Sequence, residues 1–469
     1  MEIRNPRTGQ FDYEIFPPSF EQLKIDSQRL KTNQEEWHAN GIEYRIQALE
    51  EWKKVLLDHR EEITDTITID TGRYHESVLE FNLLPTSIDR WVKYAKIFFG
   101  QQNDKDSEVP FIRIQQENVP YSLVSVISPW NFPLLLSVID TIPALMAGCA
   151  VMVKPSEVTP RFVQVIQSTI DAVPALQKVL MYVEGAGEQG SQMLELADIT
   201  CFTGSVATGL KVYQKSASLF KPCFLELGGK DAALVFEGAD IKRAAKSILW
   251  GSTVNCGHSC LSIERVYVQN IIFEVFTRLL KEESEKIKLA TEDPKNGHIG
   301  PVISQRQVEI IDTHLADALA KGAQLVTGFD KCQIINGGYY CRPTILTNVN
   351  HDMLVMTEET FGPIIPIMSF ETEEEAIRLA NGTKFGLSGA VFAKDTETAL
   401  EVAKRMQAGA ISINECALTA VVHDGEKNSF KMSGIGGTRM GPASLQRFFR
   451  KKAYLINQNS GESPWWYKA

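Results

Sequence analysis

From Tyr121 onward the sequence carries short apolar runs, each separated from the next by a segment with helical spacing. The runs read SLVSVI, AVMVK, VLMYVEG, ITCFTG and CFLEL. A strand that is apolar on both faces is buried on both faces, and such strands alternating with helices are typical of a parallel sheet covered on each side. The pattern predicts a doubly wound α/β architecture, in which ligands bind at the carboxyl ends of the strands.

A second series of the same kind begins near Asp231 with AALVFE and RVYVQN, followed by a helix predicted over 273–288, and it continues to about Ile413. Upstream, Ser19 and Gln22 have the spacing of a capping box. Apolar residues then recur on one helical face at Ile42, Ile46, Leu49, Trp52 and Leu56. At 469 residues the chain is too long for one ordinary core. We expect a mainly helical start followed by two α/β domains.

Composition narrows the class of protein further. Hydrophobic residues make up 44% and charged residues 23%, which is the balance of folded, soluble proteins, and the net charge of -10 opposes binding to nucleic acid. The start, MEIRNPRTGQF, lacks the pattern of a secretory signal, and no run reaches the roughly 18 apolar residues of a membrane helix. The eight cysteines, far apart in such a chain, favour reduced thiols. We expect a cytoplasmic protein with no nucleic-acid or membrane partner.

Two glycine-bearing turns are candidates for a phosphate-binding site. The segment 185–190, GAGEQG, has the G-x-G-x-x-G form, but in a chain with 32 glycines this spacing is a weak signal, and an ordinary loop is the simpler interpretation. The segment 204–209, GSVATG, follows the strand-like ITCFT and opens a helical stretch, whose free N–H groups attract phosphate oxygens. A plain strand-to-helix turn explains the second segment about equally well.

Cys260 stands in the segment CGHSC, for which three interpretations compete. A structural zinc site would use Cys256, His258 and Cys260, but the sequence offers no second cluster to complete the four ligands. A buried, inert thiol is the usual state of a cytosolic cysteine. A nucleophile is the third interpretation, and it requires a nearby base or positive field, because a thiol with a pKa of about 8.5 is mostly protonated at neutral pH.

Glu226 is a candidate base. It ends an apolar run and stands in the segment ELGGK, where Gly228 and Gly229 leave little side-chain bulk beside it. Its carboxylate could therefore turn into a cleft. Taken alone, a solvated glutamate beside a turn is the simpler interpretation.

These segments belong to a larger set. The set comprises PWNFP (129–133), KPSE (154–157), FTGS (202–205), ELGGK (226–230), Gly257-x-x-Cys260 with Arg265, and ETFGP (359–363). In this order the six segments closely resemble the aldehyde dehydrogenase superfamily, and the resemblance extends from NPRTG near the start to KMSG at 431–434. It implies an α/β fold with a Rossmann-type cofactor domain, a second α/β catalytic domain and a small β oligomerisation arm.

The resemblance also suggests domain limits. It places the cofactor-binding domain at 1–106 and 126–228, the catalytic domain at 229–438, and the oligomerisation arm with its tail at 107–125 and 439–469. Because this arm pairs subunits in the family, we expect a homodimer or homotetramer. The aromatic end, SPWWYKA, is interpreted either as a docking tail at a subunit interface or as a frayed terminus.

The resemblance assigns the catalytic roles. Cys260 is the nucleophile that attacks an aldehyde to give a thiohemiacetal, and the side-chain amide of Asn131 helps to hold the oxyanion. Loss of hydride to the nicotinamide then leaves a thioester on the cysteine. Glu226 is the general base that activates the water releasing the acid. The non-acylating reaction is favoured over a coenzyme A-acylating one, which usually lacks this glutamate.

The cofactor contacts carry over in the same way. The matching positions are Trp130, Lys154, Glu157, Gly204, Ser205, Gly209, Glu359 and Phe361. Lys154 and Glu157 match the residues that hold the adenosine ribose, Ser205 meets the pyrophosphate, and Glu359 holds the nicotinamide ribose. A carboxylate at 157 accepts hydrogen bonds from a free 2′-hydroxyl and repels a 2′-phosphate, so NAD is favoured, with NADP as the alternative. No metal is expected.

Three positions depart from the family pattern. His258 stands where many members have glutamine, and the stretch 427–431 lacks the paired glycines common before KMSG. Arg439 stands where many members have a second glutamate that relays protons, so deacylation would rest on Glu226 alone. We therefore expect a changed thiol environment or a tolerated substitution at His258, and a differently shaped loop before KMSG.

The sequence defines the substrate less closely than it defines the reaction or the cofactor. The positions expected to line its path are Phe132, Leu136, Ile139, Ser259 and Leu261. A mainly apolar lining favours an aliphatic or aromatic aldehyde. Alternatively, Arg439 reaches inward and holds a carboxylate, which would make the substrate a semialdehyde. A non-catalytic structural or binding member of the fold is the remaining alternative, although this chain keeps both the thiol and its oxyanion donor.

Overall fold

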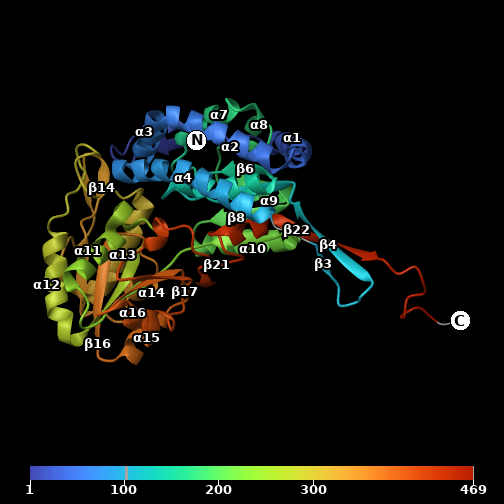
Figure 1. The fold of residues 1–469 in the computed structure, drawn as a ribbon. Coiled ribbons are helices and arrows are strands. Elements are labelled where there is room, and N and C mark those ends of the chain that lie inside the picture. Colours follow the sequence, from blue (N-terminus) through green and yellow to red (C-terminus); the bar gives the residue numbers. More distant parts are fainter. Residues whose placement is uncertain (101–103, 468–469) are drawn as a thin grey trace.

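The computed structural model describes residues 1–100 and 104–467, and its first large sheet carries the strands predicted after Tyr121 (Figure 1). In the described part of the chain this sheet has six strands, in the order β21 (Gly434–Ile435), β9 (Cys223–Glu226), β8 (Ile199–Thr203), β5 (Leu123–Ile127), β6 (Ala150–Lys154) and β7 (Leu180–Tyr182). Five of them are parallel, whereas β21 adds to the edge of β9 in the antiparallel sense. The prediction of a parallel sheet is confirmed here, since all five predicted runs form its strands.

The second large sheet follows the same principle. Among the described residues it has seven strands, in the order β12 (Gln324–Thr327), β15 (Thr344–Thr347), β16 (Ile364–Phe370), β11 (Ile263–Gln269), β10 (Asp231–Val235), β18 (Ser388–Phe392) and β19 (Ala410–Ile413). All pairs are parallel except β12 with β15. Along β10, Ala232 and Leu234 pack into one apolar cluster and Ala233 and Val235 into another. The sheet is therefore covered on both faces, as its continuous apolar strands require.

Helices surround both sheets. Around the first lie α1 (Phe20–Ala39), α2 (Gly41–Asp58), α3 (Arg60–Thr71), α4 (Tyr74–Phe99), α5 (Pro133–Val138), α6 (Thr141–Ala147), α7 (Phe162–Asp171), α8 (Pro174–Gln177), α9 (Gly187–Leu196) and α10 (Val206–Ser218). Around the second lie α11 (Ile241–Thr253), α12 (Phe273–Ser284), α13 (Gln305–Ala320), α14 (Leu354–Thr357), α15 (Glu373–Asn381) and α16 (Thr396–Ala403). The Ser19 hydroxyl accepts a hydrogen bond from the Gln22 N–H at 3.2 Å, which confirms the N-cap. The Gln22 side chain donates to Asp26 at 3.0 Å, so the reciprocal bond of the predicted capping box is not formed. Figure 1 shows the two groups as separate bodies of the chain.

A third, smaller sheet projects from the molecule (Figure 1). It consists of β22 (Phe449–Asn457), β4 (Ile112–Pro120) and β3 (Asp104–Asp106) within the described residues. The limits drawn from the sequence assign β3 to the cofactor domain, although it pairs with β4 in this projecting sheet. They assign the first residues of β5 to the arm, although β5 belongs to the first large sheet. In the aromatic end, Trp465 stacks on Phe111 with ring centroids 5.6 Å apart, whereas Lys468 and Ala469 lie outside the described residues, as do 101–103 of the predicted cofactor domain.

Short antiparallel pairs complete the fold, and one of them corrects an expectation. The pairs are β1 (Glu2–Arg4) with β2 (Phe11–Glu14), β13 (Gln333–Ile335) with β14 (Gly338–Tyr340), and β17 (Phe385–Gly386) with β20 (Phe430–Lys431). Cys332 and Cys341 flank the β13–β14 hairpin and form a disulfide, with Cα atoms 4.7 Å apart. The expectation of reduced thiols throughout is therefore wrong for these two, because hairpin pairing brings them opposite each other.

No helix in the described ranges is long and apolar enough to cross a bilayer.

Candidate active site

Cys260 is positioned by an unusual turn between α11 and β11. Three consecutive residues before it, Asn255, Cys256 and Gly257, have φ angles of 58°, 59° and 72°, in the left-handed region. A side chain at Gly257 would overlap the carbonyl of Gly362, so only glycine fits there. The turn delivers Cys260 to a partly exposed position, whereas Cys256 is fully buried in the apolar core of the second sheet.

Asn255 and Asn131 stabilise this turn. The Asn255 amide donates to the backbone carbonyls of Asn131 and His258, at 2.7 and 3.0 Å. The Asn131 amide also donates to the His258 carbonyl at 3.0 Å, and Asn131 is buried. On the outer side, Glu76 accepts from the Asn255 backbone N–H at 3.0 Å. The structure therefore brings the amide of Asn131 against the chain two residues before Cys260.

Glu226 is the last residue of β9, beside the turn that carries Cys260. Its Oε2 accepts a hydrogen bond from the Ser429 hydroxyl at 2.8 Å and lies 3.7 Å from the Lys427 ammonium. Gly228 and Gly229 were expected to leave room for the Glu226 carboxylate. In the structure, their missing side chains instead leave room for neighbouring segments of the chain. A Cβ at Gly228 would overlap the Glu359 carboxylate, and a Cβ at Gly229 would lie 2.6 Å from the Cys260 carbonyl oxygen.

The Cys260 thiol is surrounded by both acidic and basic side chains. Desolvation by the surrounding protein raises the pKa of Cys260 to about 12, with contributions in the same direction from Glu226, Glu359 and Asp231, and in the opposite direction from Lys427. Burial likewise raises the pKa of Cys256 to about 12. Of these two cysteines, partial exposure makes Cys260 the one that a substrate can reach.

Several of the candidate cofactor contacts lie at the ends of strands of the first sheet. Lys154 ends β6, and its ammonium donates to the carbonyls of Gly185 and Pro155 at 2.7 and 3.0 Å and lies 3.4 Å from Glu157. Ser205 caps α10, where its hydroxyl accepts from the Thr208 N–H at 3.3 Å. The remaining free N–H groups at this helix start suit a phosphate.

The glycines of that turn differ in what they do. A side chain at Gly209 would overlap Leu227, so this glycine permits the close packing of α10 against the chain after β9. Gly204 donates its N–H to the Glu226 carbonyl at 3.1 Å, which ties the turn to the neighbouring strand. The segment 185–190 was expected to be an ordinary loop, but its residues from Gly187 onward form the first turn of α9. The Gly185 carbonyl before that helix anchors Lys154.

Glu359 stands at the junction of the two sheets. Its Oε1 accepts from the Gly229 N–H at 3.0 Å, and desolvation, together with the nearby Glu264 charge, raises its pKa to about 8. Glu264 in turn accepts from the Thr360 and Phe361 N–H groups at 2.7 and 2.8 Å, and it binds the buried Lys230 ammonium at 2.6 Å. Lys230 was part of the ELGGK motif but had no role assigned from the sequence; here it fixes the segment that carries Glu359.

His258 has a defined structural position. Its Nδ1 lies 2.6 Å from the Phe361 carbonyl, and its Nε2 accepts from the Ile303 N–H at 3.3 Å, which fixes the neutral tautomer with the proton on Nδ1. Burial holds the pKa of His258 well below its ordinary value. The ring stacks on Phe361 at 5.7 Å between centroids and meets the edge of Trp130 at 5.1 Å. Both nitrogens are engaged with backbone groups, so the zinc interpretation of this segment is wrong.

The residues predicted to line the substrate path differ in accessibility. Phe132 is the residue before α5, and Leu136, one turn along that helix, is also half-buried, whereas Ile139 and Ser259 are buried. Leu261 packs against an apolar cluster of the second sheet. The Leu136 N–H donates to the Phe132 carbonyl at 3.0 Å, and the Leu261 N–H donates to the Ser259 hydroxyl at 3.2 Å. The role of these residues as a lining stays a prediction.

Arg439 is held in a buried ion pair. Its guanidinium donates to Asp140 at 2.7 Å, and Arg447 donates to the other oxygen of that carboxylate at 2.8 Å. Burial would raise the pKa of Asp140, but the two guanidinium groups outweigh it and hold the pKa below its ordinary value. The alternative in which Arg439 turns inward to hold a substrate carboxylate is therefore contradicted by this buried ion pair.

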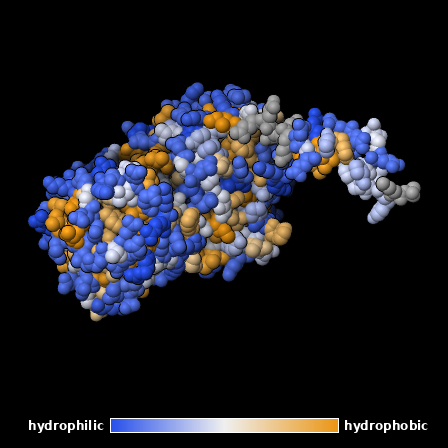
Figure 2. Space-filling model, turned by 60° about the horizontal axis from the view of Figure 1, so that its bottom comes forward, coloured by the Kyte–Doolittle hydropathy of each residue, from blue (hydrophilic) through white to orange (hydrophobic). Residues whose placement is uncertain are grey.

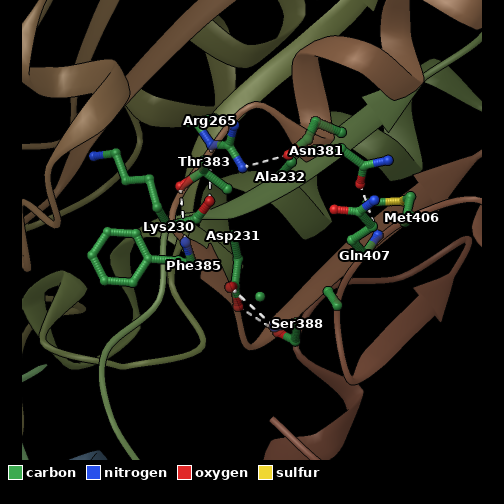
Figure 3. Close-up of a pocket in the computed structure, with 13 residues that line it drawn as sticks. Lys230, Asp231, Ala232, Arg265, Asn381, Thr383, Phe385, Ser388, Met406 and Gln407 are labelled. Carbon is green, nitrogen blue, oxygen red and sulfur yellow. Dashed lines mark hydrogen bonds between the residues drawn. The ribbon is translucent and has the colours of Figure 1, made fainter. Parts of the chain in front are cut away.

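Behind the site lies a small pocket between β10, β11 and β18 (Figure 3). Figure 3 shows the carboxyl group of Asp231 pointing toward Ser388, whose hydroxyl and N–H both donate to it. Burial raises the pKa of Asp231 to about 7. Arg265, the arginine of the Gly257-x-x-Cys260 motif, donates to the carbonyls of Lys230, Leu379 and Ala380 at 2.9, 3.1 and 2.9 Å, so it links the residue before β10 to the end of α15.

Comparison with known proteins agrees with this geometry. The aldehyde dehydrogenase family model matches residues 1–454. A solved structure described as the putative aldehyde dehydrogenase PutA from Anabaena variabilis is 51% identical, with a TM-score of 0.98 and full coverage of both chains. Betaine aldehyde dehydrogenase from Staphylococcus aureus, solved in complex with NAD+, is 29% identical with a TM-score of 0.92, covering 100% of this chain and 94% of that one.

A curated relative, the 4,4'-diapolycopene aldehyde oxidase of a Methylomonas species, is 34% identical over 439 residues, which are 92% of this chain and 81% of the relative. The match to the family model, at residues 1–454, spans both large sheets and the six motifs that carry the resemblance. The chain belongs to the aldehyde dehydrogenase family.

Proposed function

We propose that this protein oxidises an apolar aldehyde to a carboxylic acid, with Cys260 as nucleophile, Asn131 as oxyanion donor, Glu226 as general base and NAD as oxidant. The observation that carries the proposal is the meeting of three segments: the Cys260 carbonyl lies against Gly229, three residues after Glu226, and the Asn131 amide binds the same turn. Oxidation of an aldehyde to an acid is the activity of the family.

The residues present fit NAD. Glu157 beside Lys154 offers a carboxylate to ribose hydroxyls, the start of α10 at Ser205 offers free N–H groups to phosphate, and Glu359 lies where Gly228 leaves space. A negative side chain at Glu157 disfavours a 2′-phosphate, so NAD is preferred over NADP. When bound, NAD supplies a nicotinamide ring that accepts a hydride.

The side chains of this chain perform the remaining chemistry. The Cys260 sulfur forms the bond to the aldehyde carbon, and the Asn131 amide, with its second N–H, donates to the oxygen that becomes negative. After oxidation the acyl group is held as a thioester on Cys260. Glu226 then accepts a proton from water, and the water oxygen attacks the thioester carbon. The bond between this carbon and sulfur breaks, which releases the carboxylic acid and regenerates the Cys260 thiol on the protein.

An apolar aldehyde is the substrate class we favour. Phe132 follows Asn131, whose amide binds the turn before Cys260, and Leu261 follows Cys260 directly. Together with Leu136 they are apolar, so as a lining they would offer no charge to a polar substrate. Arg439, the cation on which a semialdehyde substrate depended, is bound to Asp140. The name of the Methylomonas relative likewise refers to an aldehyde of 4,4'-diapolycopene.

A panel of purified aldehydes tests the function. Aliphatic, aromatic, carboxylate-bearing and quaternary ammonium aldehydes are incubated with the protein and NAD or NADP, and the absorbance of the reduced cofactor and the acid product are followed. We expect the highest kcat/KM with an apolar aldehyde and NAD. Preference for a carboxylate-bearing aldehyde would refute the substrate class, and binding of NAD without reduction by any aldehyde would refute the activity.

The pKa of Glu359 predicts how NAD binding depends on pH. Protonation removes the charge that accepts ribose hydroxyl hydrogen bonds, and the pKa is raised to about 8. Below that pH the acid is protonated and binding is weaker; as the pH rises through it, the carboxylate forms and binding strengthens. Calorimetric titration should show NAD affinity increasing between roughly pH 7 and 9, with a flatter dependence for Glu359→Gln. Equal slopes for both proteins would contradict this role.

We also propose that the projecting sheet pairs subunits into a homo-oligomer. Leu455 on β22 and Trp465 beyond it are exposed, at 69% and 60%, and Figure 2 shows apolar surface on this arm. Light scattering should therefore give a dimer or tetramer, and Leu455→Asp should shift it toward the monomer. A monomeric wild-type protein would contradict this proposal.

The division into domains and the cytoplasmic location stay predictions.

A further inference from the structure

Lys427 is a buried lysine in the loop where the sequence departs from the family pattern. Its side chain is only 6% exposed. Within residues 1–100 and 104–467, Glu226 is its single ion-pair partner, with 3.7 Å between Nζ and Oε2, and no acceptor lies within hydrogen-bond distance of its ammonium. Burying an ammonium costs free energy unless a charge or a polar group compensates it. The ammonium therefore has donors to spare beside the candidate base.

Main-chain contacts fix this loop against β9. Gly434 of β21 pairs with Glu226, and the Leu227 N–H donates to the Ser433 carbonyl at 2.8 Å. At the other end, the Lys427 N–H donates to the Thr438 hydroxyl at 3.0 Å. Because both ends are bonded, the loop keeps Lys427 and Ser429 on the carboxylate of Glu226 without depending on the ion pair itself.

Lys427 and Cys260 share the surroundings of one carboxylate. The Lys427 ammonium lies 3.7 Å from Glu226, and the Cys260 backbone carbonyl lies against Gly229, three residues after Glu226. Among the charged groups around Cys260, the carboxyl groups of Glu226, Glu359 and Asp231 disfavour a thiolate, whereas the Lys427 ammonium favours one. Arg439 also lies near Glu226 but is bound to Asp140. Without Lys427, the thiol would stand among carboxyl groups with no opposing charge, and a thiolate in such a position is strongly disfavoured.

We propose that Lys427 is a positioning residue of this active site, which orients Glu226 and supplies the positive charge that favours the Cys260 thiolate. In the step it assists, the thiol proton leaves to water, the sulfur keeps the electron pair, and Lys427 stays protonated throughout. The proposal rests on the proposed function in one respect, namely that Cys260 is the nucleophile.

Alkylation of Cys260 tests this without turnover. Wild type, Lys427→Met, Lys427→Arg and the control Lys404→Met, which removes a lysine charge from the exposed end of α16, are treated with iodoacetamide over roughly pH 6 to 10, and the labelled Cys260 peptide is quantified by mass spectrometry. We expect the rate profile of Lys427→Met to move toward higher pH by about one unit, the lower end of the shift that a nearby opposite charge produces, because the thiolate loses the positive charge that favours it. Lys427→Arg should restore the profile, and Lys404→Met should match the wild type.

Three results would overturn the proposal. These are an unshifted profile for Lys427→Met in a protein with native circular dichroism, a shift equal to that of Lys404→Met, and an unshifted profile with a loss of kcat/KM confined to carboxylate-bearing aldehydes. The last would place the ammonium on the substrate instead. Failure of the proposed function has a separate signature, because it would appear as NADH formation that persists in Cys260→Ser.

Discussion

Replacing Cys260 with serine is expected to reduce NADH formation from the best aldehyde by about 10⁴-fold or more, because the sulfur that forms the covalent bond is lost and a hydroxyl is far less acidic and less nucleophilic. The turn that carries Cys260 is held by Asn255 and Asn131 through backbone carbonyls, and no hydrogen bond in the described structure uses the sulfur. The variant should therefore fold normally and still bind NAD. Initial rates, with NAD binding measured by calorimetry, give the comparison.

The matched control is Cys223→Ser at the opposite end of β9, where a half-buried thiol lies away from Glu226. It should keep nearly the full rate. Residual activity of Cys260→Ser within tenfold of the control would mean that another group attacks the aldehyde, and the assignment of the nucleophile would be wrong.

Replacing Glu226 with glutamine should lower steady-state turnover by about 10²- to 10⁴-fold, the usual contribution of a general base. Glutamine has the same shape and can still accept the hydrogen bond from Ser429, now 2.8 Å from the carboxylate, but it cannot take a proton from water. Because hydride loss precedes the step that needs the base, rapid mixing should still show a burst of NADH close to one equivalent per subunit.

An exposed glutamate after β10 provides the control, since Glu237→Gln removes a carboxylate without touching the site. It should turn over like the wild type. Loss of the burst together with steady turnover in Glu226→Gln would place this glutamate in the first chemical step instead of the last.

The fold was predictable for those strands whose continuous apolar residues indicate that both of their faces are buried. Continuous runs such as AVMVK and ITCFT became β6 and β8, because a strand covered on both faces has no polar positions to interrupt the signal. Strands of two residues, such as β20 and β21, carry no periodicity, and tertiary contacts alone define them. The Cys332–Cys341 disulfide was missed for a related reason, since it depends on how the β13–β14 hairpin closes.

The candidate site was predictable as a set of motifs but not as an arrangement. The resemblance named Cys260, Glu226 and Asn131, yet it could not show that Gly228 and Gly229 make room for Glu359 and for the Cys260 backbone. Lys427 and Lys230 were missed because a lysine in a charged stretch is usually solvent-exposed, and burial of its side chain is decided by the path of the whole loop. An inward-pointing Arg439 remained open as an alternative because the sequence gives no sign of its partner, Asp140, which lies far away in the chain.

The most direct test of the account is to look for the acyl group itself. Glu226→Gln is mixed with NAD and the best aldehyde, quenched in acid, digested and analysed by mass spectrometry. The account predicts that the peptide containing Cys260 gains the mass of the acyl group in step with the NADH formed. NADH formation with that peptide unmodified, or with the acyl group on a different residue, would contradict it.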